Sequence, residues 1–514
     1  MRWHWLVSLC AACGRLGFDP MPESLVDAVD PVDVLDANAG IDAREQLAQH
    51  LYLKASNAGS YDEFGYTIAI SGDTLVIGGR FDDSNAIGVD GDQTNALSPA
   101  SGAVFVFVRS GTTWVQQAYL KASNTDTDDA FGGAVAISGD TLVVGARFED
   151  SASVGVDGDQ ADDTATDAGA AYVFTRTAGV WSQQAYLKAS NTEAGDELGV
   201  AVAVSGDTIA VAAHREGSDA TTINGNQGNG PGTQYGAAYV FTRTAGVWSQ
   251  QAYIKGSQVT AGSLFGGRLA LAGDTLVVPA RLEASSSGSV YVFTRSGTTW
   301  SEQVRLRASN AGAGDRFGQS VGLSGDTLAV GALGEDSSAA GVDGAQGDNS
   351  ALESGAAYVF TRSGAVWTQQ AYLKASNTDP DDSFGHSIAV FGDTIVVGAN
   401  AEKSLATGVD GDQANNGSSF AVPLATPTGP GAAYVFQRVG TSWSQRAYLK
   451  ASNTVDDMGS AGGVFGYAVA LDDQTIAVGA IYEDGQSQGI GGDQTQPVDP
   501  MGSAENSGAV YLFR

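Results

Sequence analysis

The stretch FGGAVAISGDTLVVGARFEDS, residues 131–151, decides the fold, because the chain repeats it along its whole length. Phe-Gly pairs begin at residues 64, 131, 265, 317, 384 and 465, and Leu198-Gly199 fills the one gap in this series. The successive spacings are 67, 67, 67, 52, 67 and 81 residues, so there are seven copies. Each copy holds two short apolar runs joined by a Gly-Asp turn. A repeat of this length, made of strands, predicts the blades of a β-propeller.

Each copy is expected to form four strands. In the second copy, residues 135–137 and 142–144 flank the turn Ser-Gly-Asp-Thr, and glycine suits the first central position of a tight hairpin. A long loop leads to the third predicted strand, residues 171–175, in which Tyr172 and Phe174 share one face. A second turn leads to residues 184–188. The predicted fold class is therefore all-β, a seven-bladed β-propeller of four-stranded blades.

The two ends of the repeat region predict how the ring closes. The chain stops after residues 509–513, the third strand of the last copy, and no fourth strand follows. The sequence QHLYLKA at residues 49–55 aligns instead with QQAYLKA at residues 116–122, a fourth strand. We therefore expect the N-terminal strand to complete the last blade, which removes an open sheet edge and closes the ring.

Aromatic residues also recur once per copy. One interpretation is an array that binds sugars; the other is packing between blades, which a fixed register favours. Tryptophan recurs at Trp114, Trp181, Trp248, Trp300, Trp367 and Trp443. We expect these side chains to pack between blades.

The composition restricts the partners. The 514 residues include 58 acidic and 26 basic side chains, a formal net charge of −32. Phosphate binding depends on Lys and Arg, so nucleic acid and anionic membrane surfaces are excluded as partners. The charge favours divalent cations or cationic partners, or it serves solubility alone. The two cysteines, Cys10 and Cys13, lie before the repeats, so the folded body contains no disulfide.

The N-terminus reads as an export signal. Arg2 precedes the apolar run WLVSLCAA, which is too short to span a bilayer. Ala11-Ala12 before Cys13 and Gly14 after it resemble a bacterial lipoprotein signal, with Cys13 as the lipidated residue. An ordinary signal peptide is the alternative. The expected organisation is a signal segment at residues 1–13, a disordered acidic tether at 14–46 and the propeller at 47–514.

Phe-Gly opening a hairpin and Gly-Ala closing it resemble the FG-GAP repeat family, the seven-bladed propeller of integrin alpha subunits and many bacterial surface proteins. The resemblance covers residues 47–514, although copies such as Gly78-Gly79-Arg80 and Ala212-Ala213-His214 lack the final proline. The family carries a calcium loop between the first two strands. The bare Ser-Gly-Asp-Thr turn replaces that loop here, so the family's calcium assignment does not carry over at that position.

A different acidic motif, Gly-Val-Asp-Gly-Asp-Gln, recurs in the long loops between the second and third strands. Calcium takes six to eight oxygen ligands, and an Asp-Gly-Asp turn can supply several of them. The alternative is that these side chains stabilise their own turns. The predicted calcium ligands are Asp90, Asp92, Asp157, Asp159, Asp343, Asp410, Asp412 and Asp493.

The function expected from these features is an exported, lipid-anchored binding, adhesion or display module of the cell envelope. It would be monomeric, and its acidic loop face would contact a protein or polysaccharide at the cell surface. The alternatives are a polysaccharide lyase or hydrolase and a purely structural envelope protein. No catalytic residue is assigned; the best off-pattern candidates are His214, Arg215, Arg281 and Arg305.

Overall fold

In the computed structural model, the described residues are 47–228, 233–416, 429–454, 463–485, 487–492, 494 and 505–514. Residues 1–46, and with them Cys13, the signal and the tether, lie outside these ranges. In the part of the chain that is described, no helix has the length and apolar character needed to cross a membrane.

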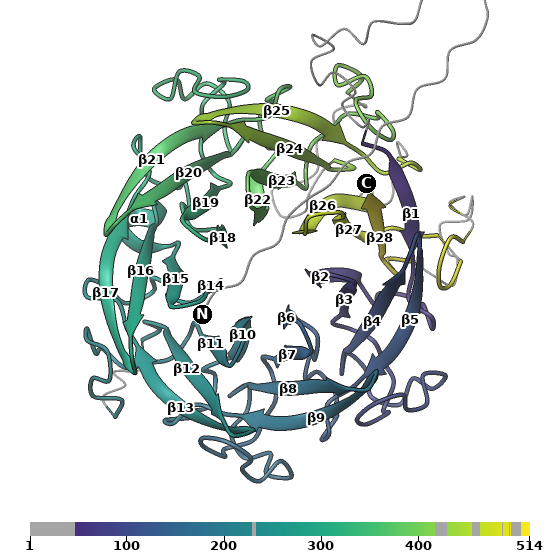
Figure 1. Cartoon of the computed structure of the whole chain (residues 1–514), viewed down its shortest axis with the longest axis vertical. Coiled ribbons are helices and arrows are strands. Elements are labelled where there is room, and N and C mark those ends of the chain that lie inside the picture. The colour runs from purple at the N-terminus through teal and green to yellow at the C-terminus, as the bar shows by residue number, and fades with distance from the viewer. Residues whose placement is uncertain are drawn as a thin grey trace, which may run out of the picture. The chain divides into compact units, whose positions relative to one another are not determined.

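Seven antiparallel sheets of four strands form a ring, as Figure 1 shows. The first strand of each sheet lies innermost, and the fourth lies at the periphery. The blades are β2 (Phe64–Ser71), β3 (Thr74–Gly79), β4 (Ala103–Ser110), β5 (Thr113–Leu120); β6 (Ala134–Ser138), β7 (Thr141–Ala146), β8 (Ala170–Thr177), β9 (Val180–Leu187); β10 (Leu198–Ser205), β11 (Thr208–Ala213), β12 (Ala237–Thr244), β13 (Val247–Ile254); β14 (Ala270–Ala272), β15 (Thr275–Ala280), β16 (Ser289–Ser296), β17 (Thr299–Leu306); β18 (Ser320–Ser324), β19 (Thr327–Ala332), β20 (Ala356–Ser363), β21 (Val366–Leu373); β22 (Phe384–Phe391), β23 (Thr394–Ala399), β24 (Ala432–Val439), β25 (Ser442–Leu449); and β26 (Gly463–Leu471), β27 (Ile476–Tyr482), β28 (Ala509–Phe513), β1 (Gln49–Leu53).

The last blade confirms the predicted ring closure. Strand β1, from the start of the repeat region, pairs antiparallel with β28 from its end, and Tyr52 lies opposite Tyr511. The amide of Ala48 donates to the carbonyl of Arg514 at 2.9 Å, and the reverse bond measures 3.0 Å. Both ends of the repeat region are therefore held in one sheet. Strand β1 takes the place of the fourth strand of the seventh blade, so the outer edge of β28 is paired.

The hydrophobic core consists of layers between neighbouring blades. One layer joins Val76 and Val104 of the first blade to Phe131, Tyr172 and Trp181 of the second. Phe131, the aromatic of the Phe-Gly pair, packs edge-on against Tyr172, with ring centroids 5.4 Å apart. This apolar burial is the main favourable term in holding the blades together.

Two glycines of each repeat allow the inner strands to approach closely. Gly132 adopts φ +89°, and a Cβ there would lie 2.4 Å from the carbonyl oxygen of Ala103 in the preceding blade. A Cβ on Gly145 would lie 2.0 Å from the carbonyl oxygen of Gly199 in the next blade. Only glycine fits such positions, so the spacing between blades explains why the repeat contains these glycines.

The tryptophans pack between blades, as expected. Trp181 is 3% exposed, and its indole N–H donates to Gln117 Oε1 of the preceding blade at 2.8 Å. The guanidinium of Arg176 lies 5.0 Å from the Trp181 ring and forms an ion pair with Asp140 of the Gly-Asp turn. The repeated aromatics are therefore structural contacts.

The fourth blade departs from the repeat. Its inner strand β14 has three residues, against five to nine in the other blades. A short turn, α1 (Glu283–Ser286), replaces the long acidic loop between its second and third strands, and Ala284, Ser285 and Ser286 in it have positive φ. The fourth blade therefore differs from the others in the length of its inner strand and in the connection between its second and third strands.

Candidate functional site

The connections of the ring divide it into two faces. The hairpin turns lie on one face. The loops between second and third strands, and the links from each fourth strand to the next blade, lie on the other, which we call the connection face. Each long loop also runs back along the periphery, where isolated bridges join Val89 to Leu120 and Val156 to Leu187. Figure 1 shows these loops outside the outermost strands.

A buried ion pair holds each long loop at its base. In the second blade, Lys188 Nζ lies 2.8 Å from Glu149 Oε2, and both side chains are at most 2% exposed. The same carboxylate accepts hydrogen bonds from the Tyr186 hydroxyl at 2.5 Å and from Asn124 Nδ2 at 3.0 Å. Asn124 follows β5 of the preceding blade. The cluster therefore ties the loop both to its own blade and to its neighbour.

The same pair recurs in six of the seven blades among the described residues. Burial lowers the pKa of Lys188 below its ordinary value, and the nearby Glu149 carboxylate opposes that shift. The six pairs are Lys54–Glu483, Lys121–Asp82, Lys188–Glu149, Lys255–Glu216, Lys374–Glu335 and Lys450–Glu402, with N–O distances of 2.8 to 3.4 Å. The fourth blade has Arg307 at the lysine position, and this side chain is exposed.

The predicted calcium residues take defined places in the loops. Asp90 has φ +54°, its amide donates to the Tyr119 carbonyl at 2.8 Å, and its Oδ1 accepts from the Tyr119 amide at 2.9 Å. Asn224 makes the same bonds to Tyr253, because an amide oxygen accepts as well as a carboxylate oxygen. Equivalent residues are Asp157, Asp343 and Asp410. This position therefore attaches the loop to the outermost strand.

The second acidic position closes a local turn. Asp92 Oδ1 accepts from the Thr94 amide at 2.9 Å, and Asp159 and Asp412 accept from Ala161 and Ala414 in the same way. Asp493 lies outside the described residues. Across the described ranges, no three Asp, Glu, His or Cys side chains converge as a metal site would require. The turn-stabilising role is thus present, and calcium binding at these residues stays a prediction.

A cavity of about 220 Å³ lies on the axis of the ring. It is lined by residues from the inner edge of all seven blades, mostly where the first strands begin, so it lies toward the connection face. Its lining, among the residues that the structure describes, contains Arg80, Arg147, Arg268 and His386 but no Asp or Glu. The centre of this strongly acidic protein is therefore basic.

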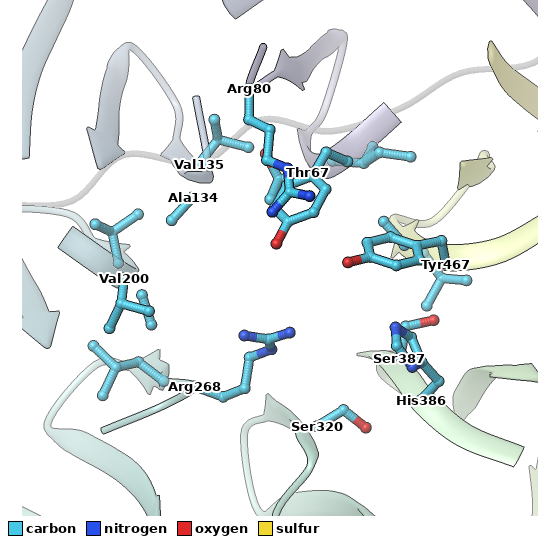
Figure 2. Close-up of a pocket in the computed structure, with 18 of the residues that line it drawn as sticks. Thr67, Arg80, Ala134, Val135, Val200, Arg268, Ser320, His386, Ser387 and Tyr467 are labelled. Atoms are coloured by element: carbon cyan, nitrogen blue, oxygen red, sulfur yellow. The ribbon is translucent and has the colours of Figure 1, made fainter. Parts of the chain in front are cut away.

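The arginines around the cavity differ in their partners. Arg80 pairs with Glu63 at 2.7 Å, and Arg147 lies 3.8 Å from Glu197. Arg268 donates to the carbonyl of Gly267 at 3.0 Å, and no described carboxylate lies within ion-pair distance of it. Figure 2 shows its guanidinium pointing into the cavity, across from His386 and Tyr467.

A second uncompensated cation lies nearby. Arg281 donates to Gln319 Oε1 at 3.1 Å. Burial, together with the charges of Arg268 and Arg316, lowers the pKa of Arg281 to about 10. Burial is the main cause of this shift, and the positive charges of Arg268 and Arg316 add to it, so Arg281 lies in a locally basic environment.

Aromatic side chains form the wall on the other side of the cavity. The ring of Tyr467 lies 4.9 Å from His386 and 5.2 Å from Tyr66, centroid to centroid. The guanidinium of Arg80 stacks over Tyr66 at 3.9 Å. Burial and the positive charges of Arg268 and Arg281 hold the pKa of His386 well below its ordinary range, so this ring is neutral.

The off-pattern residues named from the sequence separate in space. Arg281 lies beside the axial arginines, whereas His214 and Arg215 both bind Glu197, at 3.2 and 2.6 Å. Arg305 lies on outer strand β17 and pairs with Glu283. The sequence analysis did not name Arg268, although an arginine at this position breaks the repeat pattern of small residues. The other six blades have Thr67, Ala134, Ala201, Ser320, Ser387 and Ala468 at this position.

The sequence profile of the FG-GAP repeat matches residues 48–107, 114–174, 181–241, 248–293, 300–360, 367–422 and 443–513. The chain belongs to the FG-GAP repeat family. Each match runs from the fourth strand of one blade toward the third strand of the next, so the family's repeat unit is offset from the blade. No curated protein matches the chain.

In this FG-GAP propeller, buried aspartates precede several Phe-Gly pairs. Asp129 is 3% exposed and accepts from the Asp126 amide at 3.0 Å. Burial raises the pKa of Asp129 to about 8, partly opposed by that hydrogen bond. Burial likewise raises the pKa of Asp382 to about 8, and those of Asp62 and Asp196 to about 7.

Replacing Lys188 by methionine should destabilise the propeller by about 3–5 kcal/mol, because Glu149 would remain as an uncompensated buried charge. Adding Glu149→Gln should recover part of this loss. The matched control is Arg307→Met in the fourth blade, where the side chain is exposed, and it should change stability by less than about 0.5 kcal/mol. The measurement is denaturant unfolding; equal losses at residues 188 and 307 would contradict the role of the pair.

The propeller should become less stable as the pH rises from 5 to 8. The folded-state pKa of Asp129, about 8, exceeds an unfolded value of about 3.9, so between these values the folded state binds the extra proton. One such group contributes a slope of up to about 1.4 kcal/mol per pH unit. Asp129→Asn should flatten the measured profile, whereas Asp128→Asn, at an exposed neighbour, should not. Identical slopes for both variants would refute this assignment.

Proposed function

We propose that this FG-GAP propeller is an exported, lipid-anchored binding module of the cell envelope. Cys13 carries the lipid, and residues 14–46 separate the propeller from the membrane. The connection face then contacts a protein or polysaccharide at the cell surface, with calcium bound at the acidic loops.

The observation that carries this proposal is the contrast between the bases and the tips of the long loops. At the base, the Lys188–Glu149 pair and its equivalents are fully buried. Toward the tip, Asp157 and Asp159 are exposed. Loops that are fixed at their base and also tied to the outermost strand at Asp157, with exposed carboxylates, suit a binding surface, because little conformational entropy is lost when a ligand docks.

Charge density supports the calcium part of the proposal. Exposed carboxylates on neighbouring loops repel one another when they lie within the Debye length, about 8 Å at physiological salt. A divalent cation would relieve that repulsion. Extracellular calcium modules bind at about 10⁻⁴ to 10⁻³ M, which suits a surface protein.

Calcium should raise the melting temperature, with saturation in the millimolar range. At ten times the dissociation constant, one site adds about 1.4 kcal/mol. The test is calorimetry in calcium, in magnesium and in sodium chloride of matched ionic strength. Asp157→Asn with Asp159→Asn should reduce the calcium effect while keeping the turn bonds, as Asn224 and Asn226 already do. An equal shift in all three salts would mean screening alone.

Cys13→Ser should release the protein from the membrane fraction into the soluble fraction of the producing cells. Lipidation needs the thiol, and an acyl anchor with more than one chain gives stable attachment. Cys10→Ser is the matched control and should leave the protein in the membrane fraction. Retention of the Cys13→Ser variant in the membrane would disprove anchoring through this residue.

A further inference from the structure

We propose that the axial cavity binds the carboxylate group of a small ligand, with Arg268 as its principal contact. This site lies at the hub of the ring and is separate from the acidic loops at its periphery. The proposal therefore goes beyond the loop-mediated binding described above.

The first argument is the local charge. The chain carries 58 acidic against 26 basic residues, yet the described lining of the cavity contains three arginines and no carboxylate. Glu63 and Glu197 lie close to Arg80 and Arg147, which leaves Arg268 and Arg281 without a described acidic partner. Partly buried cations without a counter-charge are costly, so a ligand anion at this point would be stabilising.

The second argument is that the blade does not need an arginine at position 268 in order to fold. At the same position, Thr67 and Ser320 each donate a hydroxyl hydrogen bond to a carbonyl oxygen of the next blade, at 2.7 Å. Ala134 and Ala201 fill the position without any such bond. An arginine makes neither contact and adds an uncompensated charge. A residue that is replaceable for folding and unfavourable by charge points to a ligand.

The third argument is the shape of the groups around Arg268. A guanidinium presents a planar fork of donors that matches the two oxygens of a carboxylate. Opposite it, the Tyr467 ring lies between His386 and Tyr66, tilted against both, and this row of rings offers aromatic surface to the body of a ligand. Figure 2 shows Arg268, Tyr467 and His386 facing the same space.

The acidic periphery selects the ligand further. A long polyanion bound at the hub would extend outward over the connection face toward exposed acidic loops such as that of Asp157 and Asp159, whereas one carboxylate on a neutral body would be repelled less. The cavity, with a volume of about 220 Å³, accommodates a small group. The class is therefore a small monocarboxylate, from either a sugar acid or an acylated amino acid.

The test is titration calorimetry of the full propeller with sodium glucuronate and with N-acetylglycine. Glucose and N-acetylglycinamide serve as neutral analogues, and sodium sulfate and sodium chloride as ionic controls. Binding of either carboxylate above its neutral analogue supports the proposal and identifies the ligand body. Binding of neither, or binding of sulfate with equal affinity, overturns it.

Variants separate the site from general charge. Arg268→Ala restores the residue found in three other blades, so it should fold normally and weaken carboxylate binding at least tenfold. Arg268→Lys keeps the charge but loses the fork, and should give an intermediate affinity. Arg307→Gln removes the same charge from the exposed periphery of the chain and should bind as the unchanged protein does. An Arg268→Ala variant with undiminished affinity would refute the assignment.

Discussion

In six of the seven blades, among the described residues, a lysine and a carboxylate are buried together at the base of a long loop, and the position of that loop depends on this pair. Taken singly, each charge would be costly to remove from water. The Glu149 carboxylate accepts hydrogen bonds from Lys188, from the Tyr186 hydroxyl and from the Asn124 amide, so its charge is compensated and the cluster spans two blades. Each charge of the pair is stable in the interior only when the other is buried beside it. The pair therefore couples the loop, the outer strand and the neighbouring blade.

The fourth blade illustrates what happens when that pair is absent. It has no long loop. Arg305 on its outer strand and Arg307 directly after that strand replace the usual Tyr and Lys, and Arg268 lies just before its inner strand. Glu283 from the short turn α1 receives Arg305 instead. The blade that lacks the long loop is thus also the blade that places Arg268 at the axial cavity. A repeat protein can change one unit in this way because each blade contacts chiefly its two neighbours.

Opposite charges occupy opposite parts of the ring. Exposed aspartates such as Asp157 and Asp159 lie on the peripheral loops, whereas Arg268 and Arg281 surround the axis. The net charge of −32 conceals this separation completely. The proposed calcium loops and the proposed carboxylate site would therefore lie in separate parts of the molecule, the first at the periphery and the second on the axis.

The repeat by itself determined the architecture: seven Phe-Gly copies, four strands in each, and an N-terminal strand aligned with fourth strands such as β5. These features follow from local periodicity and from the register of the repeats, both of which can be seen directly along the sequence. The buried pair and the axial cavity depended on tertiary structure, because Lys188 and Glu149 lie 39 residues apart and Arg268, His386 and Tyr467 come from three blades. No local pattern encodes such distances; only closing the ring brings those side chains to one edge or one axis.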